Sequence, residues 1–285
     1  MKIKMSWART AAMIASLLVA SGDEGWAGEF IRVKESEEDA RLQTAIFGYE
    51  KDGVRVDLIG AIHLADKKYY QFLNQYFEKY EVLLFEMVGG ERLGAGMERA
   101  EAADEANKVE EADKLAGLRH LYLSMESALG LTGQSSWIDY TKENFIHADL
   151  TMAEFEALQK EKGESLLSIM LQASIAAERP SRQPNSLKLM RGILTGRPDL
   201  VKLEMMHTMA DGDKHIDSLA GENVIIGDRN AKCFEVMDRE ISSGRKRLGI
   251  FYGAAHFPDM EERLEKKGFK KVSAKWLTAW RVRKN

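Results

Sequence analysis

The fold is decided by residues 42–63, which read LQTAIFGYEKDGVRVDLIGAIH. Two apolar, β-prone runs, residues 42–49 and 54–60, flank a link that contains Asp52-Gly53. An Asp-Gly pair favours the positive φ angles of a tight turn, so this stretch predicts a β-hairpin. The second run leads directly into His63, so a polar side chain is expected at the carboxyl end of that strand.

A helix and a second buried strand are expected after the hairpin. Aromatic and apolar side chains recur at helical spacing over residues 69–80, and Asp66 stands where an N-cap residue is expected. Residues 82–86 then read VLLFE, and a continuous apolar run of this kind is typical of a strand covered on both faces. Strand, helix and strand in this order predict a right-handed βαβ unit.

The C-terminal part of the chain repeats this pattern. Strand-like runs at residues 223–227 and 247–252 are separated by a helix that is expected to end at Ser243-Gly244. Residues 272–282 supply one or two closing strands. We therefore expect an α/β fold whose mixed sheet is built from N-terminal and C-terminal βαβ-like regions.

The middle of the chain, about residues 91–217, has helical patterns rich in charged residues, Ala, Leu and Met, and no strand-like run. Thr151 and Glu154 form a capping-box signature, and proline-containing breaks lie at residues 179–184 and 196–198. We interpret this region as a helical insertion or cap within a single domain that spans residues 29–285.

The first 22 residues have the layout of a secretory signal. Lys2, Lys4 and Arg9 precede the apolar residues 10–20, and small residues follow. The apolar run is about half the roughly 20 residues that span a bilayer, which favours cleavage near residue 22, or at the latest near residue 28. We expect an exported protein, periplasmic or secreted, with a membrane tether through this segment as the alternative if it is not cleaved.

Composition narrows the remaining function classes. The chain has 285 residues, of which 45% are apolar and 30% charged, as in folded soluble domains. The net charge is -4 and the isoelectric point is near 6.0, so the chain has no excess of positive charge that would attract phosphate groups. We therefore expect no nucleic-acid partner. Cys233 is the only cysteine, which excludes an internal disulfide bond.

Four apolar, strand-like runs end in residues of catalytic type. In open α/β sheets, ligands bind beyond the carboxyl ends of parallel strands, so we expect these residues to share one site, where replacing any of them costs function more than folding. A structural interpretation stays open as well, because a buried carboxylate needs a cation and an Arg can be simply that ion-pair partner. The four site residues are His63, Glu86, Arg229 and His256.

The ordered set of motifs resembles the TraB/Tiki superfamily. Members are regarded as metal-dependent proteases or as proteins that block peptide pheromones, and related folds include esterases and haem-binding lipoproteins. The resemblance implies that His63 and His256 are paired histidines, Glu86 the acidic member and Arg229 the basic member of a hydrolase-like site. The motifs cover the two flanking regions and read Gly60-Ala-Ile-His63, Leu84-Phe85-Glu86, Gly227-Asp-Arg229-Asn230 and Gly253-Ala-Ala-His256-Phe-Pro.

This chain departs from the family pattern at two positions. Many relatives have a Glu before the Arg, where this chain has Asp228, and a Gly soon after the second His and Pro, where this chain has Asp259. His147 lies between these regions, and we interpret it as a turn residue that precedes a helix capped by Asp149 or Thr151.

We therefore expect a hydrolase, most simply a metal-dependent one, that acts on a peptide or a related amide or ester outside the cytoplasm. His63, Glu86 and His256 can hold a divalent metal ion that activates water, while Arg229 holds the developing oxyanion. The same residues also support a metal-free scheme, in which a His deprotonates water and Glu86 orients the imidazole. The alternative function is a non-catalytic envelope protein that sequesters a peptide or haem.

Overall fold

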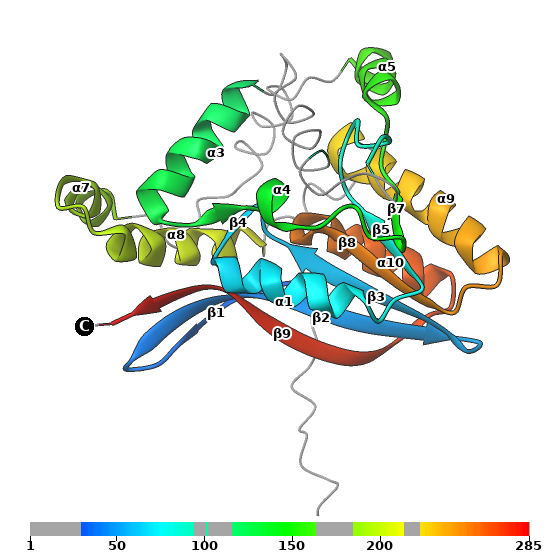
Figure 1. Cartoon of the computed structure of the whole chain (residues 1–285), viewed down its shortest axis with the longest axis horizontal. Coiled ribbons are helices and arrows are strands. Elements are labelled where there is room, and N and C mark those ends of the chain that lie inside the picture. The colour runs from blue at the N-terminus through cyan, green and yellow to red at the C-terminus, as the bar shows by residue number, and fades with distance from the viewer. Residues whose placement is uncertain (1–29, 94–100, 102–115, 164–184, 214–222, 285) are drawn as a thin grey trace, which may run out of the picture.

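The computed structural model describes residues 30–93, 101, 116–163, 185–213 and 223–284 (Figure 1). The expected signal segment, residues 1–22, and the proline-containing break at residues 179–184 lie outside this range. Within it, no helix is both long enough and apolar enough to cross a membrane.

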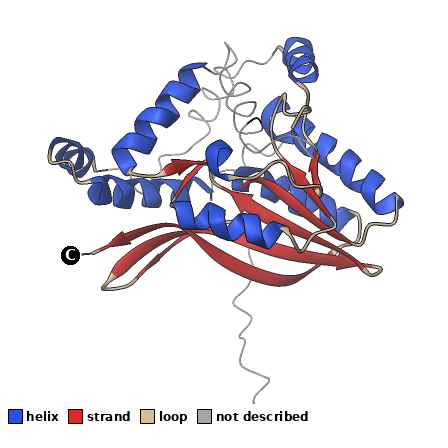
Figure 2. Cartoon of the chain, in the orientation of Figure 1, coloured by secondary structure: helices blue, strands red, loops and turns tan. Residues whose placement is uncertain are grey.

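A mixed sheet forms the centre of the molecule, with helices on both faces (Figures 1 and 2). The α/β class and the assembly of the sheet from both ends of the chain are as expected. Strand β2 (Asp39–Lys51) pairs along one edge with β9 (Lys270–Arg283). Along its other edge, β2 pairs first with β1 (Ile31–Glu35) and then with β3 (Val54–Ala61). Beyond β3, the sheet continues with β8 (Arg247–Gly253), β5 (Val82–Phe85) and β7 (Phe145–His147).

The expected hairpin is formed by β2 and β3, which run antiparallel with Ile46 opposite Ile59. Asp52 and Gly53 make the turn with φ angles of 49° and 76°. Glycine adopts such angles without strain, and Asp tolerates them better than most residues, which explains why the hairpin could be predicted. The closing segment is a single strand, β9, which pairs along nearly the whole of β2.

The other half of the sheet is parallel and contains the expected βαβ unit of β3, α1 (Lys67–Phe77) and β5. The C-terminal strand β8 lies between β3 and β5, so that Leu248 pairs with both Val56 and Val82. Because β3, β8, β5 and β7 all run in the same direction, their carboxyl ends lie at one edge of the sheet.

Two apolar cores lie on the two faces of the sheet. One contains Tyr70 and Leu73 of α1, and the other contains Phe234 of α9 (Arg229–Ser242) and Phe257 of α10 (Phe257–Lys266). α9 ends before Ser243, and Gly244 follows with a φ angle of 101°, so the expected end of this helix is confirmed.

Residues 223–227 do not form the strand that their sequence suggested. Val224–Asp228 form a π-helical turn that leads directly into α9. The Asn223 side chain accepts a hydrogen bond from the Ile226 N–H at 2.8 Å, and the Asn223 carbonyl accepts one from the Asp228 N–H at 3.2 Å. A polar cap at the start of the run thus outweighs the β preference of its Val and Ile residues.

The middle region is largely helical but is not free of strands, contrary to our expectation. β7 pairs in parallel with β5 in the main sheet, and β6 (Thr132–Gly133) pairs with β4 (Leu64–Ala65). These strands are too short to give a recognisable apolar run. The described helices of this region are α3 (Ala116–Leu129), α4 (Gln134–Trp137), α5 (Met152–Lys162), α7 (Ser186–Leu194) and α8 (Pro198–Asp213).

The local helix signals of the middle region are otherwise confirmed. Thr151 Oγ1 accepts from the Glu154 N–H at 3.1 Å, and the Thr151 N–H donates to Glu154 Oε2 at 2.8 Å, which completes the capping box of α5. The break at residues 196–198 separates α7 from α8. Asp66 precedes α1 as expected, but its carboxylate accepts from the Arg281 N–H and from Lys202 instead of capping the helix.

Candidate functional site

The ends of the four parallel strands bring the candidate residues together. In the order β3, β8, β5, β7, the residues just beyond the strands are His63, His256, Glu86 and Asp149. Ala61 lies opposite Gly253, and Phe85 pairs with both Phe251 and His147, so the strand ends are level with one another. Arg229 was expected at the end of a strand, but it is the first residue of α9.

Glu86 occupies the centre of this cluster, and its side chain is 11% exposed. One carboxylate oxygen, Oε1, accepts a hydrogen bond from the Arg229 guanidinium at 2.7 Å. The other, Oε2, accepts one from the Gly253 backbone N–H at 2.5 Å. A Cβ atom at Gly253 would lie 3.3 Å from Oε2, which is a tight contact. The second Gly-x-x-His motif therefore uses its glycine to let the Glu86 carboxylate reach the backbone.

Arg229 is held between two carboxylates. Its Nε and terminal nitrogen donate to the two oxygens of Asp149 at 2.9 and 2.6 Å, in addition to its bond with Glu86. Burial alone would lower the pKa of Arg229, but Asp149 and Glu86 together hold it above its usual range. These contacts occupy Nε and one terminal nitrogen of the guanidinium, and they support the ion-pair interpretation of Arg229.

The electrostatics of the cluster keep Glu86 ionised. Burial would raise the pKa of this carboxyl group, but Arg229, His256 and His63, in decreasing order, hold it well below its usual value. Glu86 is therefore a carboxylate over the whole physiological pH range, and it can attract a positive charge that forms beside it.

His256 is fixed from two sides and is 4% exposed. Its Nδ1 lies 2.7 Å from the side-chain oxygen of Asn230. The Asn230 NH₂ group donates to the His256 carbonyl and to Asp259, so the amide oxygen must face Nδ1, which then carries the proton. The other nitrogen, Nε2, faces Glu86 Oε1 at 3.5 Å. Asp259, one of the departures from the family pattern, thus orients the Asn230 amide.

His63 differs from the other three residues because its side chain is exposed. The loop that carries it is nevertheless anchored, because the hydroxyl groups of Tyr69 and Tyr70 donate to the carbonyls of Gly60 and Ile62 at 2.6 and 2.8 Å. Among the residues that hold the pKa of Glu86 low, His63 has a weaker influence than Arg229 and His256. His63 is thus the predicted residue best placed to meet a ligand from solution.

Gln134, at the start of α4, completes the anchoring of the His63 loop. Its N–H donates to the His63 carbonyl at 2.9 Å, and its side chain donates to the Tyr140 hydroxyl at 3.2 Å. The other side-chain atom, Oε1, is buried with no partner among the described residues. An unpaired buried acceptor of this kind is uncommon in folded proteins.

Sequence reasoning missed Asp149 and Asn230 as members of this cluster. Asp149 was assigned to helix capping, yet it accepts a hydrogen bond from the Leu150 N–H and binds Arg229, while Thr151 caps the helix. Asn230 was part of a quoted motif but received no role. No sequence signal pointed to Asp149, because β7, which ends two residues before it, is too short to form a recognisable apolar run. His147 is the last residue of β7, so its interpretation as a turn residue was wrong, and its ring faces the Met87 carbonyl at 2.7 Å.

The described residues do not form a ready metal site. No group of three His, Cys, Asp or Glu residues in the described part of the chain is placed to hold a metal ion. Both Glu86 oxygens already accept N–H groups, while the contact between Nδ1 of His256 and Asn230 leaves Nε2 as the ring nitrogen that could bind a metal ion. Metal binding by His63, Glu86 and His256 therefore stays a prediction.

Comparisons of the chain with protein-family models, with curated proteins and with solved structures found no match. The resemblance to the TraB/Tiki superfamily therefore stays a prediction from the four motifs. The function has to be argued from the chemistry of the site itself.

Proposed function

We propose that the protein is a hydrolase that cleaves a peptide or a related amide or ester at the carboxyl edge of the parallel strands. The observation that carries this proposal is the ionised, mostly buried Glu86, which lies at the same edge of the sheet as an exposed histidine, His63, and a buried one, His256. An ionised carboxylate and an exposed imidazole at one edge of a sheet are groups suited to general base catalysis.

In the proposed reaction, His63 takes a proton from a water molecule while the water oxygen attacks the carbonyl carbon. The imidazolium that forms is attracted by the Glu86 carboxylate, whose charge is maintained by its surroundings. When the tetrahedral intermediate collapses, His63 returns the proton to the leaving nitrogen or oxygen, so the histidine ends in its starting state. General base and acid catalysis of this kind contributes roughly 10² to 10⁴ in rate.

Arg229 and His256 act in this scheme as positioning residues. Arg229 holds Glu86 and Asp149 in place through one hydrogen bond to Glu86 and three to Asp149, and His256, just after β8, faces the same Glu86 oxygen. In a metal-dependent version of the reaction, His63, Glu86 and His256 would hold the ion, which would activate the attacking water. Export to the periplasm or the medium remains part of the proposal, and the intact mass of the fractionated protein tests it.

The test uses the full chain with a panel of p-nitrophenyl esters and peptide p-nitroanilides. We expect at least one member to be hydrolysed and His63→Ala to lower kcat by about 10² or more, the lower bound for loss of a general base. The matched control is His207→Ala, because His207 lies on α8 and pairs with Glu35, away from the proposed site. Metal content and activity after dialysis against EDTA are measured on the same preparations.

The outcomes distinguish the alternatives. Activity that survives EDTA and is lost in His63→Ala supports the metal-free scheme. Activity that disappears with EDTA and returns with zinc supports the metal-dependent version predicted from the sequence. If no substrate is hydrolysed while a peptide or haem binds with measurable affinity, the hydrolase proposal fails and the sequestering function replaces it.

A further inference from the structure

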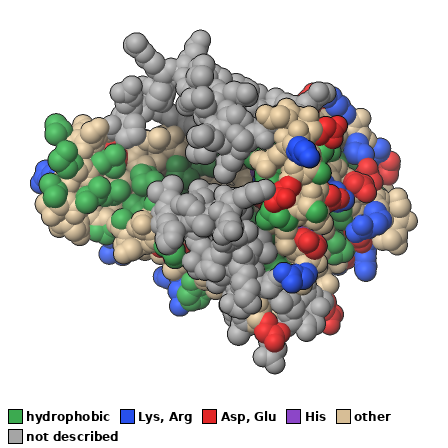
Figure 3. All heavy atoms as spheres, turned by 90° about the horizontal axis from the view of Figure 1, so that it is seen from above, with side chains coloured by type: hydrophobic (Ala, Val, Ile, Leu, Met, Phe, Trp, Pro, Cys, Tyr) green, Lys and Arg blue, Asp and Glu red, His purple; other side chains and the backbone are tan. Residues whose placement is uncertain are grey.

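Helix α7 displays an unusual amount of apolar surface. Among the large hydrophobic residues of the described chain, the four most exposed residues all lie on α7, and they are 55% to 78% exposed. The next most exposed, Val272, is 44% exposed. Figure 3 shows hydrophobic side chains gathered at the end of the molecule where α7 lies. Isolated exposed hydrophobic residues are ordinary, but a cluster of four on a nine-residue helix indicates a contact surface. The four residues are Leu187, Met190, Ile193 and Leu194.

The exposed surface is separate from the face with which α7 packs on the protein. Gly192 is buried against α8, where a Cβ atom would come within 2.7 Å of the Val201 side chain, and Leu189 packs on the main core. Successive helix positions are 100° apart, so the four exposed apolar residues fall on one side of this packed stripe. The helix is thus fixed by close packing and still presents a second apolar face to solvent.

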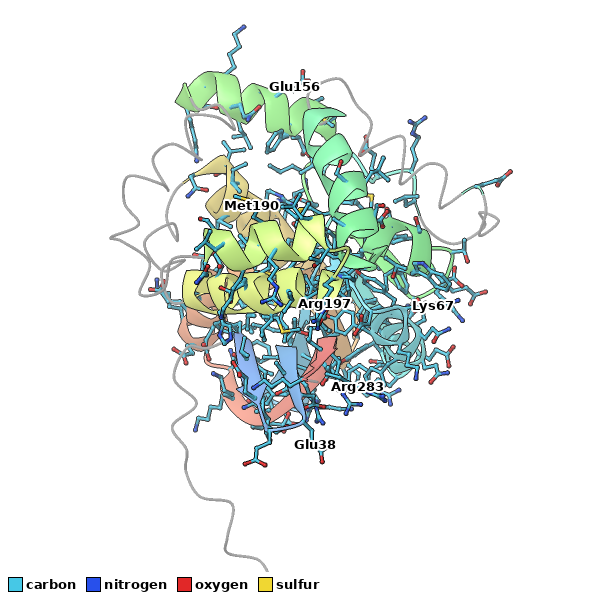
Figure 4. The ribbon with its side chains drawn as sticks, turned by 90° about the vertical axis from the view of Figure 1, so that its left-hand side faces the viewer. Glu38, Lys67, Glu156, Met190, Arg197 and Arg283 are labelled. Carbon is cyan, nitrogen blue, oxygen red and sulfur yellow. The ribbon has the colours of Figure 1, made fainter. Side chains whose placement is uncertain are left out.

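Basic side chains border this apolar face. Arg191 is exposed on α7 with no ion-pair partner among the described residues, Lys188 is exposed but paired with Glu204 at 3.1 Å, and Arg197 follows at the turn into α8. A cleft of about 490 Å³ opens beneath the turn, and three of its basic side chains are ion-paired: Arg197 with Asp199, Lys202 with Asp66 and Arg281 with Asp39. Asp39 is shared between Arg281 and Arg41, and Arg283 has no ion-pair partner among the described residues, so this end of the molecule carries an excess of positive charge. Figure 4 faces this end of the molecule, with Met190 on α7, Arg197 at the turn and Arg283 on β9 below them. The basic residues that line the cleft are Arg197, Lys202, Arg281 and Arg283.

We propose that this end of the molecule, the α7 surface and the basic cleft below it, docks on an anionic lipid membrane. Apolar side chains of an interfacial helix enter the boundary between headgroups and acyl chains, and Lys and Arg at its border attract anionic headgroups. Two copies of the chain joined through the same surfaces would bring together their Arg191 side chains, which are unpaired among the described residues, and like charges oppose such a contact. Charge complementarity therefore favours an anionic membrane over a second copy.

Binding is tested by flotation of the full chain with vesicles of phosphatidylcholine alone or mixed with 30 mol% phosphatidylglycerol, a composition chosen to give a surface of about the physiological charge. We expect binding to the mixed vesicles that weakens with added salt. The triple variant Leu187→Gln, Met190→Gln, Leu194→Gln should lower the partition coefficient by about tenfold or more, as the loss of three inserted side chains predicts. The matched control changes Leu123→Gln and Val272→Gln, which are exposed hydrophobic residues on other elements.

A site-specific probe separates α7 from any other membrane contact of the chain. An environment-sensitive fluorophore is attached to Met190→Cys, since the native Cys233 is fully buried and does not compete for the label. Emission should shift to the blue and brighten with the anionic vesicles, and a label on Val272→Cys should not respond. A silent probe at residue 190 overturns the proposal. A blue shift in lipid-free, concentrated protein together with a dimer in sedimentation equilibrium would assign the surface to a second copy instead.

Discussion

The two Gly-x-x-His motifs look alike in sequence, but the structure places their histidines in different environments. His63 ends its motif exposed at the end of β3, on a loop anchored by tyrosine hydroxyl groups. His256 ends its motif buried after β8, with one ring nitrogen at Asn230 and the other facing Glu86. One motif thus presents an imidazole to solvent, and the other builds an imidazole into a polar network.

This difference comes from the neighbours of each motif. Gly60 carries no side chain because its strand packs closely on β2, where a Cβ atom would lie 3.1 Å from the Ala45 carbonyl. Gly253 has the same property for another reason, since Glu86 must reach its backbone N–H. A repeated motif therefore does not imply a repeated role, and variants of the two regions should behave differently.

The largest effect on stability is expected for Arg229→Met, in the buried region. The substitution leaves Glu86 and Asp149 without their shared cation, and removing one partner of a buried ion pair typically costs about 3–5 kcal/mol. Urea denaturation measures the change in unfolding free energy. Arg239→Met is the control, because Arg239 is 64% exposed and pairs only with its neighbour Glu240. Equal stability of the two variants would show that the ion-pair network does not support the fold.

The next largest effect is expected for His256→Ala. The change removes a buried ring and leaves the Asn230 oxygen without its donor, which together should cost about 2–4 kcal/mol. This refines the expectation from the sequence that each of the four residues matters more for function than for folding. A melting temperature within 2 °C of wild type, roughly the change expected for only a small loss of stability, would place His256 with His63 in a purely functional role.

A smaller and pH-dependent effect is expected for Glu86→Gln. Because the folded protein holds the pKa of Glu86 well below its ordinary value of 4.5, the carboxylate contributes stability that is fully present above about pH 4.5 and is lost as the pH falls through the folded value. The difference in unfolding free energy between wild type and Glu86→Gln should therefore be largest near neutral pH and should shrink below pH 4.5. A difference that is constant from pH 7 to pH 3 would mean that the charge of Glu86 is not stabilised by its surroundings.

The sequence predicted the parts of the fold whose signals are local. The Asp52-Gly53 turn and the capping box at Thr151 each rest on a few adjacent residues, and both were found. The site was predicted in part, because three strand ends do converge, but Asp149 looked like a helix cap and residues 223–227 looked like a strand. Pairings between distant segments, such as β7 with β5, decide these cases, and a local pattern does not contain them.

The smallest effect on stability is expected for His63→Ala, and it is the change that best isolates the difference between the two motifs. The imidazole is exposed, and the loop is anchored through the carbonyls of Gly60, Ile62 and His63 itself, so the substitution keeps every one of those hydrogen bonds. Surface substitutions of this kind usually change stability by no more than about 0.5 kcal/mol. Urea denaturation of wild type, His63→Ala and His256→Ala in one series measures both motifs under the same conditions. If His63→Ala proves as destabilising as His256→Ala, the ring at position 63 is part of the folded network and is not poised for a ligand. If His63→Ala leaves the unfolding free energy nearly unchanged, the His63 side chain does not stabilise the fold. That is the result expected of a residue that acts on a substrate.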